Sequence, residues 1–238
     1  MKINSEENKH DSIYRDTLGM VGITDTAQYP IVQFIRNANV WYRKGSVWIN
    51  EAVGTWPWDD SNWTTLMATN SDLTAGTQYY ELPTGTRKID RLEVLDSNSN
   101  YQRLLPIDKS QVGSALSEFM ETDGLPRYYD LEGKYAHLYP APAAANVTAT
   151  AGLKWHIIRD VSPFGIADTA TEPGFDNHFH RVISLGAAYD YCLANGIEDR
   201  KKGFRDELDQ LHSEIKEHYG DRHRENRPRL LPVDHDSI

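Results

Sequence analysis

Two closely spaced histidines out of nine, the one cysteine and two pairs of adjacent carboxylates are the candidates for chemistry in this chain. His178 and His180 stand two positions apart in Asn-His-Phe-His-Arg, a spacing that is relevant to metal binding. On a strand both side chains would share one face, but on a helix they point to faces about 200° apart and cannot bind one ion. The alternative is a pair of solvent-exposed histidines at the start of a helix, where the helix dipole opposes protonation. We predict no metal site here.

The cysteine and the acidic pairs give no catalytic pattern either. Cys192 lies in an apolar helical pattern and is expected to pack as a small hydrophobic residue; as the one cysteine, it excludes a disulfide framework and a thiolate zinc site. The pairs Glu6-Glu7 and Asp59-Asp60 are adjacent in polar surroundings, whereas glycosidase chemistry needs carboxylates that converge from different elements. No Gly-rich phosphate loop or His-Glu-x-x-His motif occurs. The sequence therefore predicts neither an enzyme nor a cofactor site.

The composition indicates a folded, acidic protein. With 238 residues and 39% hydrophobic content, the chain can bury one large core or two small ones. Its 35 acidic and 25 basic residues give a net charge of −10, which argues against a simple nucleic-acid-binding module and suits solubility, or a wall along which DNA slides. Residues 1–10 are polar and no apolar run approaches about 18 residues, so we expect neither a secretory signal nor a membrane span.

Apolar residues at helical spacing predict the first elements. A helix is expected from Pro30, a favoured first-turn residue, to Ala52, and a shorter one before it from Asp11 to Leu18. Gly45, in the middle of the longer helix, indicates either a break or a close approach by another backbone. The apolar stripe of this helix comprises Ile31, Ile35, Ala38, Tyr42, Gly45, Ile49 and Ala52, beside a second row of Phe34, Trp41 and Trp48.

Two more helices are predicted near the C-terminus. Asp176 is a candidate N-cap for the first, which Asn195-Gly196 can end, and the second runs from about Glu198 to Tyr219. Gly186-Ala187-Ala188 supplies small residues where the Pro30 helix can cross closely, so we expect these helices to form one bundle. The inward positions of the first helix are Phe179, Val182, Ile183, Gly186, Ala187 and Leu193, and those of the second are Phe204, Leu208, Leu211, Ile215 and Tyr219.

Between the helices the hydrophobic period changes to two, which predicts strands. The clearest signal is a hairpin of Arg127–Leu131 and Tyr135–Tyr139, joined at Glu132-Gly133 and followed by Pro140 and Pro142, which stop the second strand. The remaining predicted elements are strands at Gln78–Leu82, Arg87–Leu95, Tyr101–Leu105 and Val147–Ile158, a turn at Asp96–Asn100, and a helix at Asp108–Met120 capped by Asp108 or Ser110.

Aromatic residues are the candidates for contact with a partner. Trp56, Trp58 and Trp63 lie in residues 54–76, which show neither period, so we predict an ordered loop or subunit-contact segment there. These tryptophans either cover the edge of the core or form a ligand cage. The outer face of the β-domain would carry Tyr79, Tyr128, Tyr135 or Tyr139, depending on register, and such exposed rings suit a partner or a sugar.

The predicted fold class is α+β: a bundle of N- and C-terminal helices with an inserted small antiparallel β-domain and an extended C-terminal arm. Residues 1–76 hold the first helices and the tryptophan loop, 77–160 the β-domain, 161–220 the helical hairpin and 221–238 the arm. A terminus is disordered by default, but arginines around a short apolar anchor also suit an arm that docks on another subunit. The residues of this arm are Arg222, Arg224, Arg227, Arg229, Leu230, Leu231 and Val233.

The motifs of the β-domain resemble a known family. Gly124-Leu-Pro-Arg-Tyr-Tyr129, a turn glycine and Leu138-Tyr-Pro-Ala-Pro142 are similar to the middle domain of head-to-tail adaptor proteins of short-tailed bacteriophages. The similarity covers Thr77 to Phe204, and its other motifs are Tyr80-x-Leu-Pro83, Ile89-Asp-Arg-Leu92, Trp155–Arg159, Pro173-Gly-Phe175 and Gly186-Ala-Ala188.

The resemblance implies a structural virion protein of the neck or tail that is synthesised in the host cytoplasm. Such adaptors form a ring, usually taken as dodecameric, that is attached to the portal protein and extends the DNA channel. The β-domain would face tail nozzle or tail fibre proteins, contact with packaged DNA would be transient and non-specific, and no membrane is involved. The competing hypothesis is a carbohydrate- or ligand-binding β-domain protein of a tail or surface structure.

Overall fold

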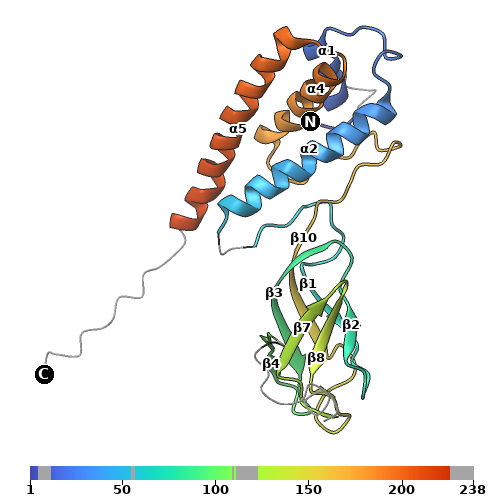
Figure 1. Cartoon of the computed structure of the whole chain (residues 1–238), viewed down its shortest axis with the longest axis vertical. Helices are drawn as coiled ribbons and strands as arrows, with labels where there is room; N and C mark the ends of the chain where they lie inside the picture. The colour runs from blue at the N-terminus through green and yellow to red at the C-terminus, as the bar shows by residue number, and fades with distance from the viewer. Residues whose placement is uncertain (5–11, 55–56, 109, 111–122, 226–238) are drawn as a thin grey trace, which may run out of the picture. The chain divides into compact units, whose positions relative to one another are not determined.

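The computed structural model describes residues 1–4, 12–54, 57–108, 110 and 123–225 as an α+β protein, as predicted (Figure 1). Contacts between residues group the chain into two compact units. The helical unit comprises Met1–Asn62 and Val161–Ile238, and the strand unit comprises Trp63–Asp160.

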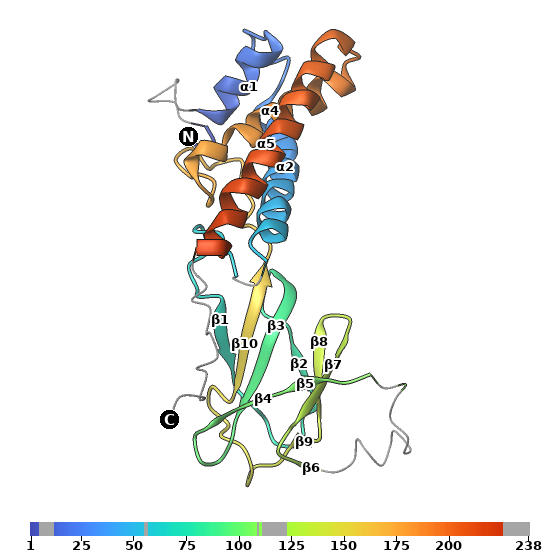
Figure 2. The same cartoon turned by 90° about the vertical axis from the view of Figure 1, so that its left-hand side faces the viewer.

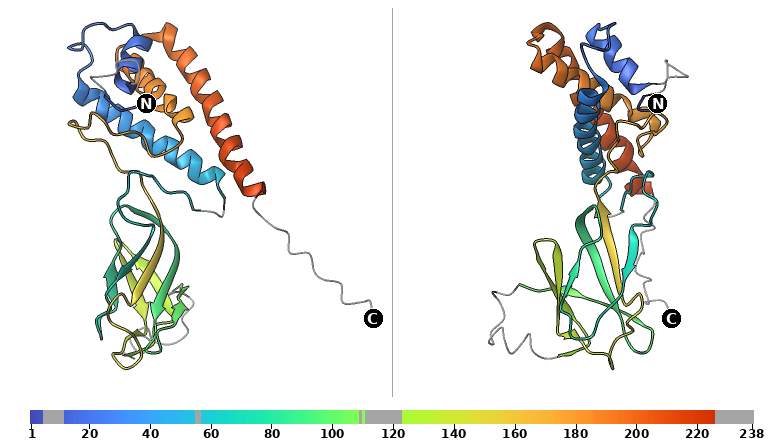
Figure 3. Two further views of the ribbon diagram at one scale, coloured as in Figure 1. Left: turned by 180° about the vertical axis from the view of Figure 1, so that it is seen from behind. Right: turned by 90° about the vertical axis from the view of Figure 1, so that its right-hand side faces the viewer.

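The helical unit is built on helices that lie side by side (Figures 1 and 3). Ser12 caps the first helix, because its hydroxyl accepts a hydrogen bond from Arg15 N, while Asp11, where the sequence placed the start, lies outside the described residues. The elements are α1 (Ile13–Val21), α2 (Ile31–Ala52), the 3-10 helix η3 (Asn177–Phe179), α4 (Arg181–Ala194) and α5 (Glu198–Glu225).

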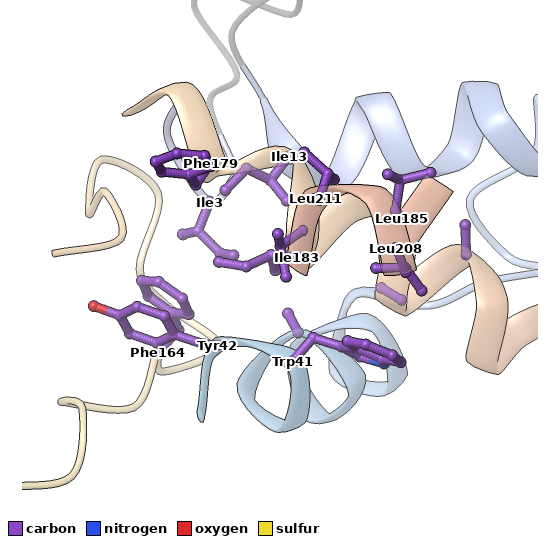
Figure 4. Packing of buried hydrophobic residues seen from close by; sticks show 14 of the residues in the cluster. Ile3, Ile13, Trp41, Tyr42, Phe164, Phe179, Ile183, Leu185, Leu208 and Leu211 are labelled. Atoms are coloured by element: carbon purple, nitrogen blue, oxygen red, sulfur yellow. The ribbon is translucent and has the colours of Figure 1, made fainter. Parts of the chain in front are cut away.

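Small residues let α2 and α4 approach closely, as predicted. A Cβ atom added to Gly186 of α4 would lie 2.0 Å from Cδ2 of Trp41 on α2, so only glycine fits there. A Cβ atom on Gly45 would lie 3.4 Å from the Phe175 ring, so the close neighbour of Gly45 is a side chain and not the backbone that we expected. The core around these contacts includes Ile3, Ile13, Tyr42, Phe164, Phe179, Ile183, Leu185, Leu208 and Leu211 (Figure 4).

A buried polar network joins the loops on both sides of the strand unit to α2. Asp60 is 3% exposed, and its two carboxylate oxygens accept hydrogen bonds from Tyr42 Oη at 2.7 Å, Ser162 N at 2.7 Å and Asn62 N at 3.2 Å. Gly174 N donates in turn to Tyr42 Oη at 2.6 Å. Burial, with the Asp60 charge, raises the pKa of Tyr42, so this hydroxyl stays protonated and donates.

The strand unit contains two four-stranded sheets that form separate layers (Figure 2). Burial alternates along β10, and Leu153, Trp155 and Ile157 point into the core with Leu92 and Leu138. One sheet has the order β1 (Ala68–Ser71), β10 (Leu153–Arg159), β3 (Thr86–Leu95) and β4 (Tyr101–Arg103), and the other β2 (Tyr79–Glu81), β8 (Tyr135–Tyr139), β7 (Tyr128–Glu132) and β5 (Leu105–Pro106). A short parallel pair joins β6 (Asp123–Gly124) to β9 (Ala141–Pro142).

The strand unit corrects several details of the sequence-based expectation. Strand β1 lies within residues 54–76, where no strand was predicted, and β10 begins at Leu153 rather than at Val147. The hairpin turn is Gly133-Lys134 rather than Glu132-Gly133, with Gly133 at the expected positive φ of 60°. Strand β8 ends at Tyr139, directly before Pro140, as predicted, and Pro142 pairs within the separate short strand β9. Of the predicted helix Asp108–Met120, only Asp108 and Ser110 lie within the described residues.

The C-terminal helices also differ in detail from the prediction. Asp176 caps η3, where its carboxylate accepts from His178 N, and α4 begins only at Arg181. Leu193 is 53% exposed and does not point inward. Helix α5 continues beyond Tyr219 to Glu225, so Arg222 and Arg224 belong to a helix and not to an extended arm.

Candidate interaction surfaces

The two histidines that were weighed as metal ligands have different environments. His178 is exposed, but His180 is only 1% exposed, which contradicts the expectation of two solvent-exposed rings. The Nε2 atom of His180 lies 2.9 Å from Phe175 O, and its Nδ1 atom lies 3.0 Å from the Met1 amino group. No group of three or more potential metal-binding side chains occurs among the residues that the structure describes.

The burial of His180 predicts a pH-dependent stability. Burial lowers the pKa of His180 below its ordinary value of 6.5, so the folded protein binds a proton on this imidazole less readily than the unfolded chain does. Below pH 6.5 the unfolded chain takes up a proton that the folded protein excludes, and the free energy of unfolding should fall by up to about 1.4 kcal/mol per pH unit. Denaturant unfolding between pH 7.5 and 5 tests this expectation for the wild type and for His180→Gln. A His178→Gln variant is the matched control, and equal slopes in all three proteins would contradict it.

Cys192 and Asp60, which we considered for catalysis, serve the fold. Cys192 is fully buried, and burial raises the pKa of its thiol, so it packs as a small hydrophobic residue as predicted. Asp60 is held in the polar network of the helical unit and has no open approach for a substrate. Glu6 and Glu7 lie outside the described residues.

The tryptophans that were candidates for partner contact are largely engaged inside their own units. Trp58 is 8% exposed and belongs to the core of the helical unit, so it does not offer a contact surface. Trp63 Nε1 donates to Asp160 O at 2.9 Å, and the Arg159 guanidinium lies 4.6 Å from the ring centroid. These contacts favour the interpretation that the tryptophans cover the core over that of a ligand cage. Trp56 lies outside the described residues.

The outer surface of the β2-β8-β7-β5 sheet brings exposed aromatic residues together. Tyr79 is 61% exposed; its ring centroid lies 6.2 Å from that of Tyr135 and 5.9 Å from that of His137. We call Tyr79, Tyr135 and His137 the tyrosine face. Tyr128 is 38% exposed but pairs with Tyr139 at the other end of the hairpin, and Tyr139 is 1% exposed. The structure therefore joins Tyr135 to Tyr79 and separates it from Tyr128.

Tyr128 borders a shallow pocket that the sequence did not reveal. The pocket has a volume of about 300 Å³ and carries two arginines, Arg103 and Arg127. Both arginines line the same pocket because β5 pairs with β7 in parallel, with Leu105 opposite Tyr128. This pairing is long-range and has no local signal in the sequence. The other lining residues are Gln102, Leu105, Leu125 and Pro126. Such a pocket suits an acidic or amide-bearing side chain of a protein partner.

No helix within the described ranges is long and apolar enough to cross a membrane.

Two comparisons with known proteins bear on the identity of the chain. A search of curated proteins finds no match. The SU10 adaptor protein family, in contrast, matches residues 15–229. The match begins in α1 and continues past Glu225, the last residue of α5. It is therefore wider than Thr77 to Phe204, the span on which the resemblance to phage head-to-tail adaptors was based. The chain therefore belongs to the SU10 adaptor protein family.

Proposed function

We propose that this protein is a structural component of a bacteriophage virion, a head-to-tail adaptor. Its copies form a ring, of about twelve chains by the family resemblance, below the portal; the ring extends the DNA channel and carries tail nozzle or tail fibre proteins. The observation that carries this proposal is the match of one adaptor family to residues 15–229, both units included. We also propose that the protein has a structural role and is not an enzyme.

The charge of the chain supports a role beside DNA without strong binding to it. A net charge of −10 on each copy repels the phosphate backbone, so contact with packaged DNA is transient and non-specific. A wall of this sign lets DNA pass without the counterion release that holds basic proteins on nucleic acid.

Sedimentation of the purified full chain, alone and mixed with portal rings, tests the proposal. The expected result is a ring-sized species that cosediments with portal. A chain that stays monomeric at all concentrations and does not bind portal rings would contradict the assembly role.

The C-terminal segment is the proposed portal-binding arm. Because α5 ends at Glu225, the arm proper starts after it, and Arg222 and Arg224 belong to its helical base. The arm residues Arg227, Arg229, Leu230, Leu231 and Val233 lie outside the described residues. In a ring, attachment of one arm makes attachment of the next effectively intramolecular, which raises avidity by about 10²–10⁴.

Deleting residues 226–238 should therefore weaken portal binding by about 100-fold or more while thermal unfolding is unchanged. The deletion removes no residue of α5, which spans Glu198–Glu225. A variant with Leu230→Ser and Leu231→Ser, which keeps the arginines, separates the apolar anchor from the charge. The arm proposal is wrong if the truncated chain binds portal as tightly as the full chain.

A carbohydrate- or ligand-binding role is the second candidate, and the tyrosine face favours it. Exposed aromatic rings can pack against the apolar faces of sugars. Tyr79 is the most exposed aromatic residue among the large hydrophobic residues of the described chain, and it meets Tyr135 edge to face. A glycan array with wild type and with a Tyr79→Ala/Tyr135→Ala variant would detect it, since binding lost in the variant assigns the face. No binding by the wild type would remove this candidate.

A further inference from the structure

The outer side of α2 carries a basic and apolar stripe. Arg36, Val40 and Arg43 follow one another at spacings of four and three residues, so they share one face of the helix, and Val40 is 42% exposed. Val32, at 57% exposure, extends the stripe by one turn. We call Arg36, Val40 and Arg43 the α2 stripe. Its charge is opposite to the net charge of −10 of the whole chain.

The outer side of α5 carries the complementary residues. Asp209, Ser213 and Glu217 are spaced four residues apart, and Asp209 and Glu217 are exposed. They lie on the side opposite to the residues that α5 buries, which include Leu208, Leu211, Ile215 and Tyr219. We call Asp209, Ser213 and Glu217 the α5 stripe.

Within one chain, α2 and α5 meet through other residues. Trp48 of α2 stacks on His212 of α5, with ring centroids 4.4 Å apart. At 100° per residue, Arg36 and Arg43 lie about 120–140° around α2 from Trp48. The two arginines of the α2 stripe are therefore directed away from the α5 of their own chain, and Val40 lies about 80° from Trp48.

The two stripes match in length as well as in charge. At 1.5 Å per residue, Arg36 and Arg43 are about 10 Å apart along α2, and Asp209 and Glu217 about 12 Å apart along α5. Both arginines can thus face both carboxylates at once, with Val40 over the small Ser213. We propose that the α2 stripe of one copy packs against the α5 stripe of the next copy. This inference rests on the proposed ring.

Such a contact uses two different surfaces of the same chain. A heterologous contact of this kind leaves one free stripe at each end of a pair, so further copies add until a ring closes. Because the ion pairs lie near solvent, the association should also weaken as salt is raised.

Charge reversal tests the contact in the full-length chain. Arg36→Glu/Arg43→Glu alone, and Asp209→Arg/Glu217→Arg alone, should each weaken assembly at least about tenfold, alone or on portal rings, by sedimentation. A chain with all four changes should assemble like the wild type, because every contact then has both charges reversed. Arg87→Glu/Lys88→Glu, on exposed β3 positions of the strand unit, is the matched control and should assemble normally. Because Arg43 also interacts within its own chain, Arg36→Glu is measured singly as well.

Site-specific crosslinking gives a second readout. A mixture of Val40→Cys chains and Ser213→Cys chains, treated with a short bis-maleimide, should give a crosslinked dimer of one chain of each kind. A mixture of Leu66→Cys and Ser213→Cys chains should not give such a dimer. The wild type controls for background crosslinking, because its Cys192 is buried. Rings that form normally with either stripe reversed, or that fail to recover with all four changes, would overturn this contact and leave the adaptor function standing. Absence of any assembly or portal binding by the wild type would instead remove the proposed function.

Discussion

Replacing Gly186 by alanine should destabilise the folded protein by about 3 kcal/mol, because the added methyl group has no space. Its Cβ atom would lie 2.0 Å from Cδ2 of Trp41. The indole cannot easily move away, since its Nε1 donates to Asp190 Oδ2 at 2.8 Å and the ring is 6% exposed in the core. Denaturant unfolding, followed by circular dichroism at 222 nm as a helix signal, measures the loss.

The matched control is the same substitution on another helix of the same unit. Gly203 lies in α5 with nothing within 4 Å of an added Cβ atom, so Gly203→Ala should stabilise the protein by up to about 1 kcal/mol through helix propensity. Opposite signs for the two variants are the expected outcome. Equal effects would show that the α2–α4 crossing is looser than the structure indicates.

Replacing Asp60 by alanine should cost about 3 kcal/mol, because it leaves buried donors without an acceptor. The donors are Tyr42 Oη, Ser162 N and Asn62 N. Because these groups come from α2 and from the loops before and after the strand unit, the loss should also expose both loops to proteolysis. Thermal unfolding and limited proteolysis measure the two effects.

Two variants give this experiment its controls. Asp60→Asn keeps the shape and one acceptor oxygen, so its loss should be intermediate between those of wild type and alanine. Asp206→Ala removes an exposed carboxylate from α5 of the same unit and should change stability by less than about 0.5 kcal/mol. A loss for Asp60→Ala no larger than that for Asp206→Ala would mean that the network does not hold the loops.

Elements whose pattern is local were predictable from the sequence. Helix α2 was expected almost to the residue, because Pro30 marks its start and its apolar spacing is continuous. The β7–β8 hairpin was equally accessible, since Gly133 supplies the required positive φ between two alternating segments. The close crossing at Gly186 followed from three small residues in a row on an apolar helix.

Elements that depend on distant partners were not predictable. Strand β1 is Ala-Thr-Asn-Ser, without a hydrophobic alternation, and it forms only because β10 offers its edge. Helix α5 passes through Gly220, although a glycine there suggests an end, because the preceding turns are anchored by buried residues such as Ile215 and Tyr219. The burial of His180 was missed for the same reason, since it depends on Phe175 and on the chain's first residue.

The candidate surfaces likewise include some that the sequence could predict and some that it could not. The motifs that indicated the adaptor family are turn and core residues that occur in order along the chain, so they could be read directly. The arginine pocket required the pairing of β5 with β7, and the α2 and α5 stripes required knowledge of which sides the core leaves exposed. Periodicity alone assigns the buried side of a helix, but only the assembled core shows what remains outside.

The hydrogen bond from Trp63 Nε1 to Asp160 O has an evolutionary consequence. It joins Trp63 and Asp160, the first and last residues of the strand unit, so the two ends of this unit lie next to each other. A segment with adjoining ends can be exchanged for another of the same kind without rethreading its host, as in tolerated domain insertions. The strand unit, Trp63–Asp160, could therefore be exchanged as one segment while the helical unit on both sides of it in the sequence is kept.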